Sequence, residues 1–182
     1  MERRLSVVIE SPVDFSALAA WMSSQGLGSG TVSDIQLLAG GTQNILARFR
    51  FADRDFVLRH PPAHLRANSN ETMRREARVL AAIASTNVPH PGLIAACPDD
   101  NILGGAFYLM EPVNGFNATT GLLELHAKSP AVRHRMGLAI AEGAAALGNL
   151  DHLSLGLEGF GRPEKFLERQ VARWGDQLGS YA

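Results

Sequence analysis

The feature that most constrains the fold is a run of alternating residues that begins shortly after a pair of glycines. The glycines are Gly40 and Gly41, and the run covers residues 45–51. Every second residue of the run is apolar and two of those between are arginines, which is the period of a strand with one buried face. Two further strand-like stretches flank the run, at 32–38 and 55–59. The sequence therefore predicts three strands in an antiparallel meander.

The remaining segments complete an α+β pattern. A first helix is expected from a cap at Ser11 to the glycines at 26 and 28, and a second at about 68–85. The second helix carries one apolar face, formed by Met73, Ala77, Leu80, Ile83 and Ala84. Short apolar runs at 93–97 and 106–110 are expected to add two strands. The predicted fold class is a five-stranded antiparallel sheet with an inserted helix, followed by a helical region.

The region after Gly115 is expected to be helical. Helices are expected at 121–127, from Ser129 through Leu147, and at 163–178. The long helix has apolar residues on two faces, so we expect it to be buried on more than one side. The predicted division is an N-terminal lobe at 1–112 and a second lobe at 113–182, joined near Pro112.

Charge and cysteine content narrow the function. The net charge of −1 gives no electrostatic case for nucleic acid or an anionic membrane. The single cysteine excludes an intrachain disulfide and a multi-cysteine metal site. No apolar stretch is long enough to span a bilayer and no secretory signal follows Met1, so a cytoplasmic protein is expected.

The glycine pair lies between two predicted strands. Dinucleotide-binding and P-loop motifs need their glycines to open a helix, so both are excluded. A glycine loop between strands can fold over a nucleotide, because its bare backbone N–H groups approach the phosphates. The alternative is a hairpin that simply requires glycine.

Glu76 is the acidic residue whose position is most informative. It lies three residues from Met73, four from Leu80 and seven from Ile83, so it projects along the apolar stripe of its helix. A carboxylate there needs a partner, and Arg59 and Arg75 are the candidates. The alternative is a side chain that tilts out to solvent.

The segment 107–115 combines an apolar strand with an acidic residue, a proline and a closing glycine. It is either an edge strand that leaves a sheet or a hinge whose backbone pairs with a purine. Because Pro112 has no N–H group, the donors of such a hinge would be Val113 and its neighbours.

Taken together, these segments resemble the aminoglycoside phosphotransferase/choline kinase-like family, which is built like the protein kinases. The similarity is greatest to the branch that includes domains fused to acyl-CoA dehydrogenases. It is carried by residues 38–44 (LAGGTQN), 56–62 (FVLRHPP), 75–80 (REARVL), 107–111 (FYLME) and 166–174 (FLERQVARW).

The resemblance implies a role for each matching residue. Gly40, Gly41, Thr42 and Asn44 would belong to the nucleotide-positioning loop. Arg59 would contact the phosphates of ATP, where many relatives have lysine, and Glu76 would orient it. The adenine site would be lined by Met110, with the backbone of Glu111 and Val113 as the hinge.

The family's catalytic loop reads His-Gly-Asp followed by Asn, with a further Asp for magnesium, and this sequence contains no such motif. No catalytic residue or metal ligand is therefore assigned within the chain. We expect a truncated helical lobe, with the catalytic residues and the Mg²⁺ ligands downstream of Ala182.

The leading interpretation is the nucleotide-binding portion of an ATP-dependent kinase for a hydroxyl of a small metabolite. The expected partners are nucleotide and a small-molecule substrate, with a homodimer or other association through the exposed helical face. A non-catalytic kinase-like module that binds nucleotide or a protein partner is the alternative. A plain α+β structural domain would require Arg59 and Glu76 to lie far apart.

Overall fold

The computed structural model describes residues 13–38, 44–62, 68–162 and 164–181. The chain divides into two compact units, 1–149 and 150–182. The lobe boundary expected at 112/113 lies just after the last residue of the sheet, Met110, and it stays a prediction. No helix in the described segments is both long enough and apolar enough to cross a membrane.

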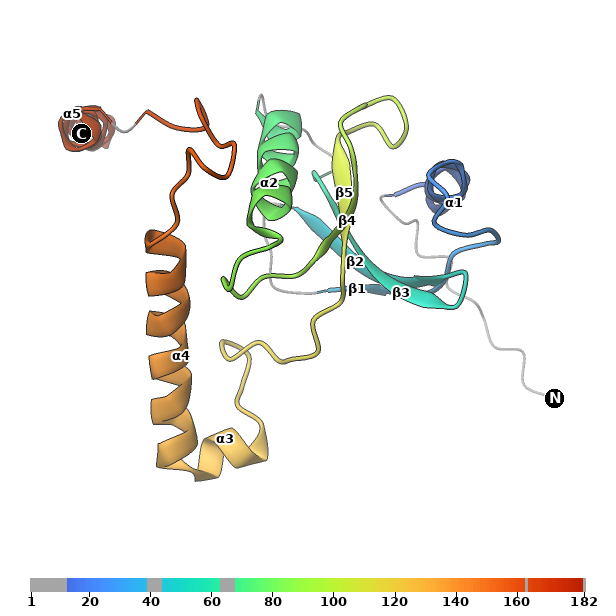
Figure 1. Cartoon of the computed structure of the whole chain (residues 1–182), viewed down its shortest axis with the longest axis horizontal. Coiled ribbons are helices and arrows are strands. Elements are labelled where there is room, and N and C mark those ends of the chain that lie inside the picture. Colours follow the sequence, from blue (N-terminus) through green and yellow to red (C-terminus); the bar gives the residue numbers. More distant parts are fainter. Residues whose placement is uncertain (1–12, 39–43, 63–67, 163, 182) are drawn as a thin grey trace. The chain divides into compact units, whose positions relative to one another are not determined.

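A five-stranded antiparallel sheet forms the centre of the first unit (Figure 1). Its strands are β1 (Ser33–Leu37), β2 (Ile45–Phe51), β3 (Arg54–His60), β4 (Leu93–Cys97) and β5 (Phe107–Met110). The strand order is β1-β2-β3-β5-β4, so β5 pairs with β3 and β4 lies at the edge. The predicted sheet is confirmed, and the bounds of β2 and β4 match the sequence pattern.

The strands are two-sided because successive side chains point to opposite faces. One face carries the main core, which joins β2, β3 and β5 to helix α1 (Phe15–Ser24). The sheet contributes Ala47, Phe49, Phe51, Phe56, Leu58, Phe107 and Leu109 to it. The residues between them therefore face the other side, which α2 (Ser69–Ile83) covers in part.

Helix α1 begins later than its sequence suggested. Its cap is Asp14, whose carboxylate accepts hydrogen bonds from the N–H groups of Ser16 and Ala17 at 2.9 and 3.0 Å. The expected cap at Ser11 lies outside the described residues, and the helix starts at Phe15. The apolar residues Leu18, Ala19 and Met22 are buried. The cap at Asp14 therefore starts the helix at the point where this apolar stripe meets the sheet.

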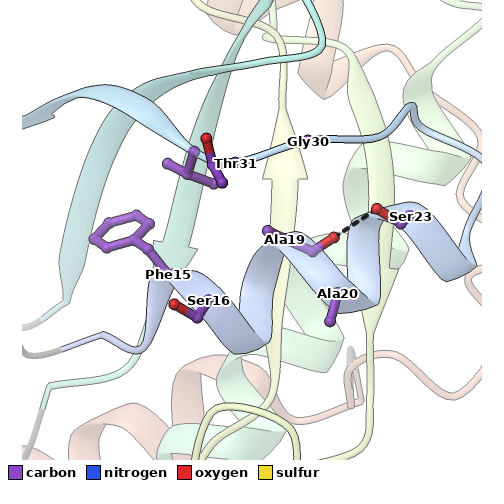
Figure 2. Close-up of a pocket in the computed structure, with 8 residues that line it drawn as sticks. Phe15, Ser16, Ala19, Ala20, Ser23, Gly30 and Thr31 are labelled. Atoms are coloured by element: carbon purple, nitrogen blue, oxygen red, sulfur yellow. Dashed lines mark hydrogen bonds between the residues drawn. The ribbon is translucent and has the colours of Figure 1, made fainter.

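One side of α1 lines a small pocket with the chain just before β1 (Figure 2). Its volume is ≈ 350 Å³, and its walls include Phe15, Thr31 and Val32. Ser23 also lines the pocket, and its hydroxyl donates to the carbonyl of Ala19 at 2.9 Å. This pocket belongs to the α1 side of the sheet.

Helix α2 packs on the opposite face. Its buried residues are Met73, Ala77 and Ile83, which confirms most of the predicted stripe, and Leu80 is partly buried. The prediction that Ala84 belongs to this stripe is wrong, because Ala84 is the exposed C-cap residue and not part of the last turn.

Three helices follow the sheet: α3 (Glu124–Lys128), α4 (Pro130–Gly148) and, in the second unit, α5 (Phe166–Gly179). Ser129 caps α4 by accepting from the N–H of Val132. The prediction that α4 is buried on more than one side is wrong for the described chain, in which none of its residues is buried. The short α3 is the element packed against it and covers too little of its surface. Leu138, Ile140 and Leu147 are exposed.

Candidate functional site

Strand alternation gathers the candidate residues on the α2 side of the sheet. Phe56, Leu58 and His60 of β3 point to the α1 side, so Val57 and Arg59 point the other way. The same rule applied to β2 and β5 adds Leu46, Arg48, Tyr108 and Met110 to this face. A functional face therefore arises from every second residue of three adjacent strands.

Arg59 and Glu76 form a two-point ion pair across the space between β3 and α2. Arg59 Nε donates to Glu76 Oε2 at 2.7 Å, and Nη2 donates to Oε1 at 2.9 Å. The side chains are 26% and 32% exposed, so the pair is neither buried nor fully solvated. The predicted contact is present, with Arg59 rather than Arg75 in the fork, so the separation of the two residues that a plain structural domain would require is not observed.

A third residue meets this pair. The hydroxyl of Tyr108 donates to Glu76 Oε2 at 3.1 Å. Tyr108 is buried, and this burial, together with the adjacent Glu76 charge, raises the pKa of its phenol well above its ordinary value. Tyr108 was part of the quoted 107–111 motif but received no role, although it lies two residues before Met110 and so on the same face.

The N-terminal half of α2 is tied to the β4–β5 connection. Arg74 donates to the carbonyl of Pro98 through Nε at 3.0 Å and through Nη2 at 2.8 Å. Asn70 donates to Asp100 at 3.1 Å and accepts from the N–H of Ala106 at 3.0 Å. These contacts hold the helix at the height that lets Glu76 reach β3, and sequence reasoning missed them because they span 24 to 36 residues.

A cleft of ≈ 510 Å³ opens on the same face, beside the point where the chain leaves β5. Its walls come from β1, β2, β3 and the segment after β5. They include the predicted residues Met110, Glu111 and Val113, and also Gln36, Leu38, Leu46, Arg48, Val57 and Asn114. The apolar side chains of Leu46 and Val57 provide a surface on which a planar ring can pack.

The backbone after β5 has one N–H group engaged within the protein. The N–H of Glu111 donates to the carbonyl of Gly92 at 2.8 Å, so it is occupied within the protein. Pro112 supplies no N–H. Val113 is 70% exposed and lines the cleft. Val113 is therefore the first residue after β5 that lines the cleft, carries a backbone N–H group and is not held by the contact to Gly92.

Arg48 is a charged lining residue that sequence reasoning missed. It donates to Asp55 at 2.6 Å across the β2–β3 hairpin, and this hydrogen bond holds the pKa of Asp55 below its ordinary value. The alternation of β2 contained the signal, because Arg48 follows Leu46 on the cleft face.

The predicted phosphate loop is only partly described. Gly40, Gly41 and Thr42 lie outside the described residues, whereas Asn44 is described and is half-buried directly before β2. The strands on either side of the loop pair antiparallel, and the N–H of Leu38 donates to the carbonyl of Leu46 at 2.8 Å. The loop thus connects two neighbouring strands, as the sequence predicted.

Metal ligands do not gather near this site in the described segments. Across them, no group of three or more His, Cys, Asp or Glu side chains is placed to hold a metal ion. The described residues therefore offer no ligand set for Mg²⁺.

Comparisons with known proteins agree with this geometry. A family model described as "Phosphotransferase enzyme family" matches residues 34–180. A solved structure assigned as an aminoglycoside phosphotransferase, from Ralstonia eutropha, is similar with a TM-score of 0.69 and 29% sequence identity. The match covers 92% of this chain and 47% of that chain. The α+β arrangement of sheet and helices is therefore a kinase-like phosphotransferase fold.

Curated relatives are similar over most of this chain. It is 30% identical over 153 residues to acyl-CoA dehydrogenase family member 10 of Mus musculus, covering 83% of this chain and 14% of that protein. It is 31% identical over 178 residues to acyl-CoA dehydrogenase family member 11 of Pongo abelii, covering 94% and 22%. The chain thus spans less than a quarter of the length of these relatives.

Proposed function

Because the chain belongs to the phosphotransferase enzyme family, we propose that it is the ATP-binding portion of a kinase that phosphorylates a hydroxyl group of a small metabolite. The nucleotide occupies the cleft on the α2 side of the sheet, between β2, β3 and the segment after β5.

The bidentate pair of Arg59 and Glu76 is the observation that carries the proposal. The guanidinium has five N–H donors, and the fork to Glu76 uses two of them. Glu76 thereby fixes the plane of a cation on the sheet face that carries the cleft, opposite the cleft residue Leu46 in the pairing of β2 with β3. A guanidinium held in one plane suits phosphate oxygens, because its planar, permanently charged donor set matches their geometry.

The hinge segment supports adenine at the other end of the cleft. Adenine presents a ring acceptor beside an exocyclic donor, and the Val113 N–H and Glu111 C=O form the complementary pair. Met110, half-buried at the end of β5, lines the back of this space, and Leu46 and Val57 lie against the ring. Gly40, Gly41, Thr42 and Asn44 are proposed to cover the phosphates.

The chemistry assigned to this chain is binding and orientation. Magnesium, when bound with ATP, neutralises charge on the β- and γ-phosphates. Arg59 adds a second positive charge on the phosphates, and the cleft holds the base so that the triphosphate extends toward the reacting hydroxyl. No proton acceptor for that hydroxyl is assigned here, because the 182-residue sequence has no His-Gly-Asp motif.

Calorimetric titration with Mg-ATP tests the binding role. Arg59→Ala should weaken binding by about 10- to 100-fold, since a hydrogen bond to a charged group contributes roughly 1.5–3 kcal/mol. Arg59→Lys should lose less, because the charge stays and only the fork is lost. Arg50→Ala is the matched control: it removes an arginine from the same strand face as Arg48, at an exposed pair with Asp53. Equal affinity for wild type and Arg59→Ala would remove Arg59 from the site.

An activity assay separates binding from transfer. The chain is incubated with Mg-ATP and a panel of hydroxylated metabolites, and mass spectrometry then detects phosphorylated products. We expect ATP binding without product from residues 1–182. Stoichiometric product that disappears in a Gly40/Gly41 double variant would place the chemistry within this chain. ATP binding without transfer in every longer form of the protein would favour the non-catalytic module.

A further inference from the structure

We infer that Tyr108 is a positioning residue of the nucleotide site: its hydroxyl holds the Glu76 carboxylate in the orientation that presents Arg59 to the phosphates. The inference rests on the proposed function, because it gives Tyr108 a task in a site where Arg59 binds phosphate.

The register of the sheet places Tyr108 beside Arg59. The two are direct cross-strand partners in the antiparallel pair of β3 and β5. Side chains at such positions share a face, with Cβ atoms about 4.5–5.5 Å apart. Glu76 approaches the same point from α2, so the three residues meet from three different elements. A small movement of any one element therefore changes the geometry of the other two.

The distribution of hydrogen bonds shows what the tyrosine adds. Glu76 Oε2 accepts from both Arg59 Nε at 2.7 Å and Tyr108 OH at 3.1 Å, while Oε1 accepts from Arg59 Nη2 at 2.9 Å. With arginine as its only donor, the carboxylate could rotate together with that long side chain. A donor carried by the central strands removes this freedom, because it fixes one oxygen relative to the sheet.

Tyr108 is itself held firmly. Its side chain is buried in a cluster with Met73, Ala77 and Ala106, between α2 and the sheet. The contacts of Asn70 and Arg74 set the height of α2, but they lie toward the N-terminus of the helix and end on the β4–β5 connection. In the part of the chain that the structure describes, Tyr108 is the donor to the Glu76 carboxylate besides Arg59. Its raised pKa keeps the phenol protonated as a donor across the physiological range.

The test compares Tyr108→Phe with wild type by calorimetric titration of the 182-residue chain with Mg-ATP and, separately, with adenosine. Loss of the hydroxyl should weaken Mg-ATP binding by about 3- to 10-fold, the usual effect of one hydrogen bond. Adenosine binding should change by less than about twofold, because adenosine has no phosphate for Arg59 to contact. Tyr181→Phe is the control, since it makes the same chemical change at an exposed residue of the other unit.

Two results would overturn the inference. Unchanged Mg-ATP affinity in Tyr108→Phe would show that the hydroxyl does not position Arg59. An equal loss of affinity for ATP and adenosine would show that Tyr108 only supports the sheet.

A second measurement does not depend on nucleotide. A double-mutant cycle of Arg59→Ala and Glu76→Ala gives the coupling between the two residues, expressed as a factor in the unfolding equilibrium constant. This coupling factor should fall by about half or more when the cycle is repeated in the Tyr108→Phe background. An unchanged factor would refute the positioning role. If the wild-type chain binds neither Mg-ATP nor adenosine, the proposed function is refuted. The coupling factor alone would then decide whether Tyr108 orients the pair of Arg59 and Glu76.

Discussion

Removing the Arg59–Glu76 pair one residue at a time should reveal a coupling that exceeds that of an ordinary surface pair. The perturbation is a cycle of Arg59→Ala, Glu76→Ala and the double variant. The Glu76 carboxylate accepts three hydrogen bonds. The side chains of Arg59 and Glu76 are each between a quarter and a third exposed to solvent. Exposed pairs contribute up to about 1 kcal/mol, whereas removing one partner of a buried pair costs roughly 3–5 kcal/mol.

The partial exposure places this pair between those limits. We expect each single variant to lose about 2 kcal/mol of unfolding free energy, and the coupling to be about 1–1.5 kcal/mol. Arg59 has further interactions besides this fork, and the cycle subtracts them because they are lost equally with and without Glu76.

Urea unfolding monitored by tryptophan fluorescence provides the measurement. The chain has two tryptophans, and Trp174→Phe leaves Trp21 as the single reporter. Trp21 packs edge-on against Phe107 with ring centroids 4.8 Å apart, so its emission follows the core of the first unit. A parallel cycle on Arg50 and Asp53, where the carboxylate is fully solvated, should show coupling close to zero. Additive losses from Arg59→Ala and Glu76→Ala would refute the reading of the pair as a fixed unit.

Four further outcomes are expected. In an absorbance titration of a Tyr181→Phe variant, which keeps Tyr108 as its one phenol, Tyr108 should ionise only above the ordinary phenol range of about pH 10 or on unfolding; ionisation within that range would contradict its hydrogen bond and burial. Because its folded pKa is raised, the stability that Tyr108 contributes should be complete below pH ~10 and decline as the pH rises further, and Tyr108→Phe should remove that part of the decline. Asp14→Ala should lower the unfolding free energy by about 0.5–2 kcal/mol while Asp14→Ser stays close to wild type, and equal losses in the two variants would argue against the cap. Light scattering should show self-association that Ile140→Glu reduces, since Ile140 is 75% exposed on α4; a monomer at all concentrations would be evidence against this surface as an interface.

Local pattern was enough to predict the parts of the fold in which one face of one element decides the answer. The alternation of 45–51 fixed β2, because only every second residue could enter the aromatic core. The spacing of Glu76 from Met73, Leu80 and Ile83 placed its carboxylate toward the sheet, and a charge in that position needs a cation within reach.

Features that depend on which elements become neighbours could not be predicted in the same way. Tyr108 lies beside Arg59 because β5 pairs with β3 while β4 takes the edge, and no single strand encodes that order. The sequence predicts a cap of α1 at Ser11, whereas tertiary packing of the helix against Phe49 and its neighbours favours the later start that Asp14 caps. The apolar faces of α4 showed that cover would be favourable but not which segment would provide it.

The two-sided character of β3 also bears on how faithfully this sheet assembles. Leu58 enters the aromatic core while the adjacent Arg59 reaches the ion pair, so a slip of one residue in the pairing with β2 would exchange their places. A guanidinium would then lie among phenylalanines without a partner, at a cost large enough to reject the misaligned sheet during folding. Arg59, which is proposed to bind phosphate, therefore also disfavours the shifted register of β3. Its replacement by a small apolar residue should allow a population of mispaired chains that the native sequence excludes.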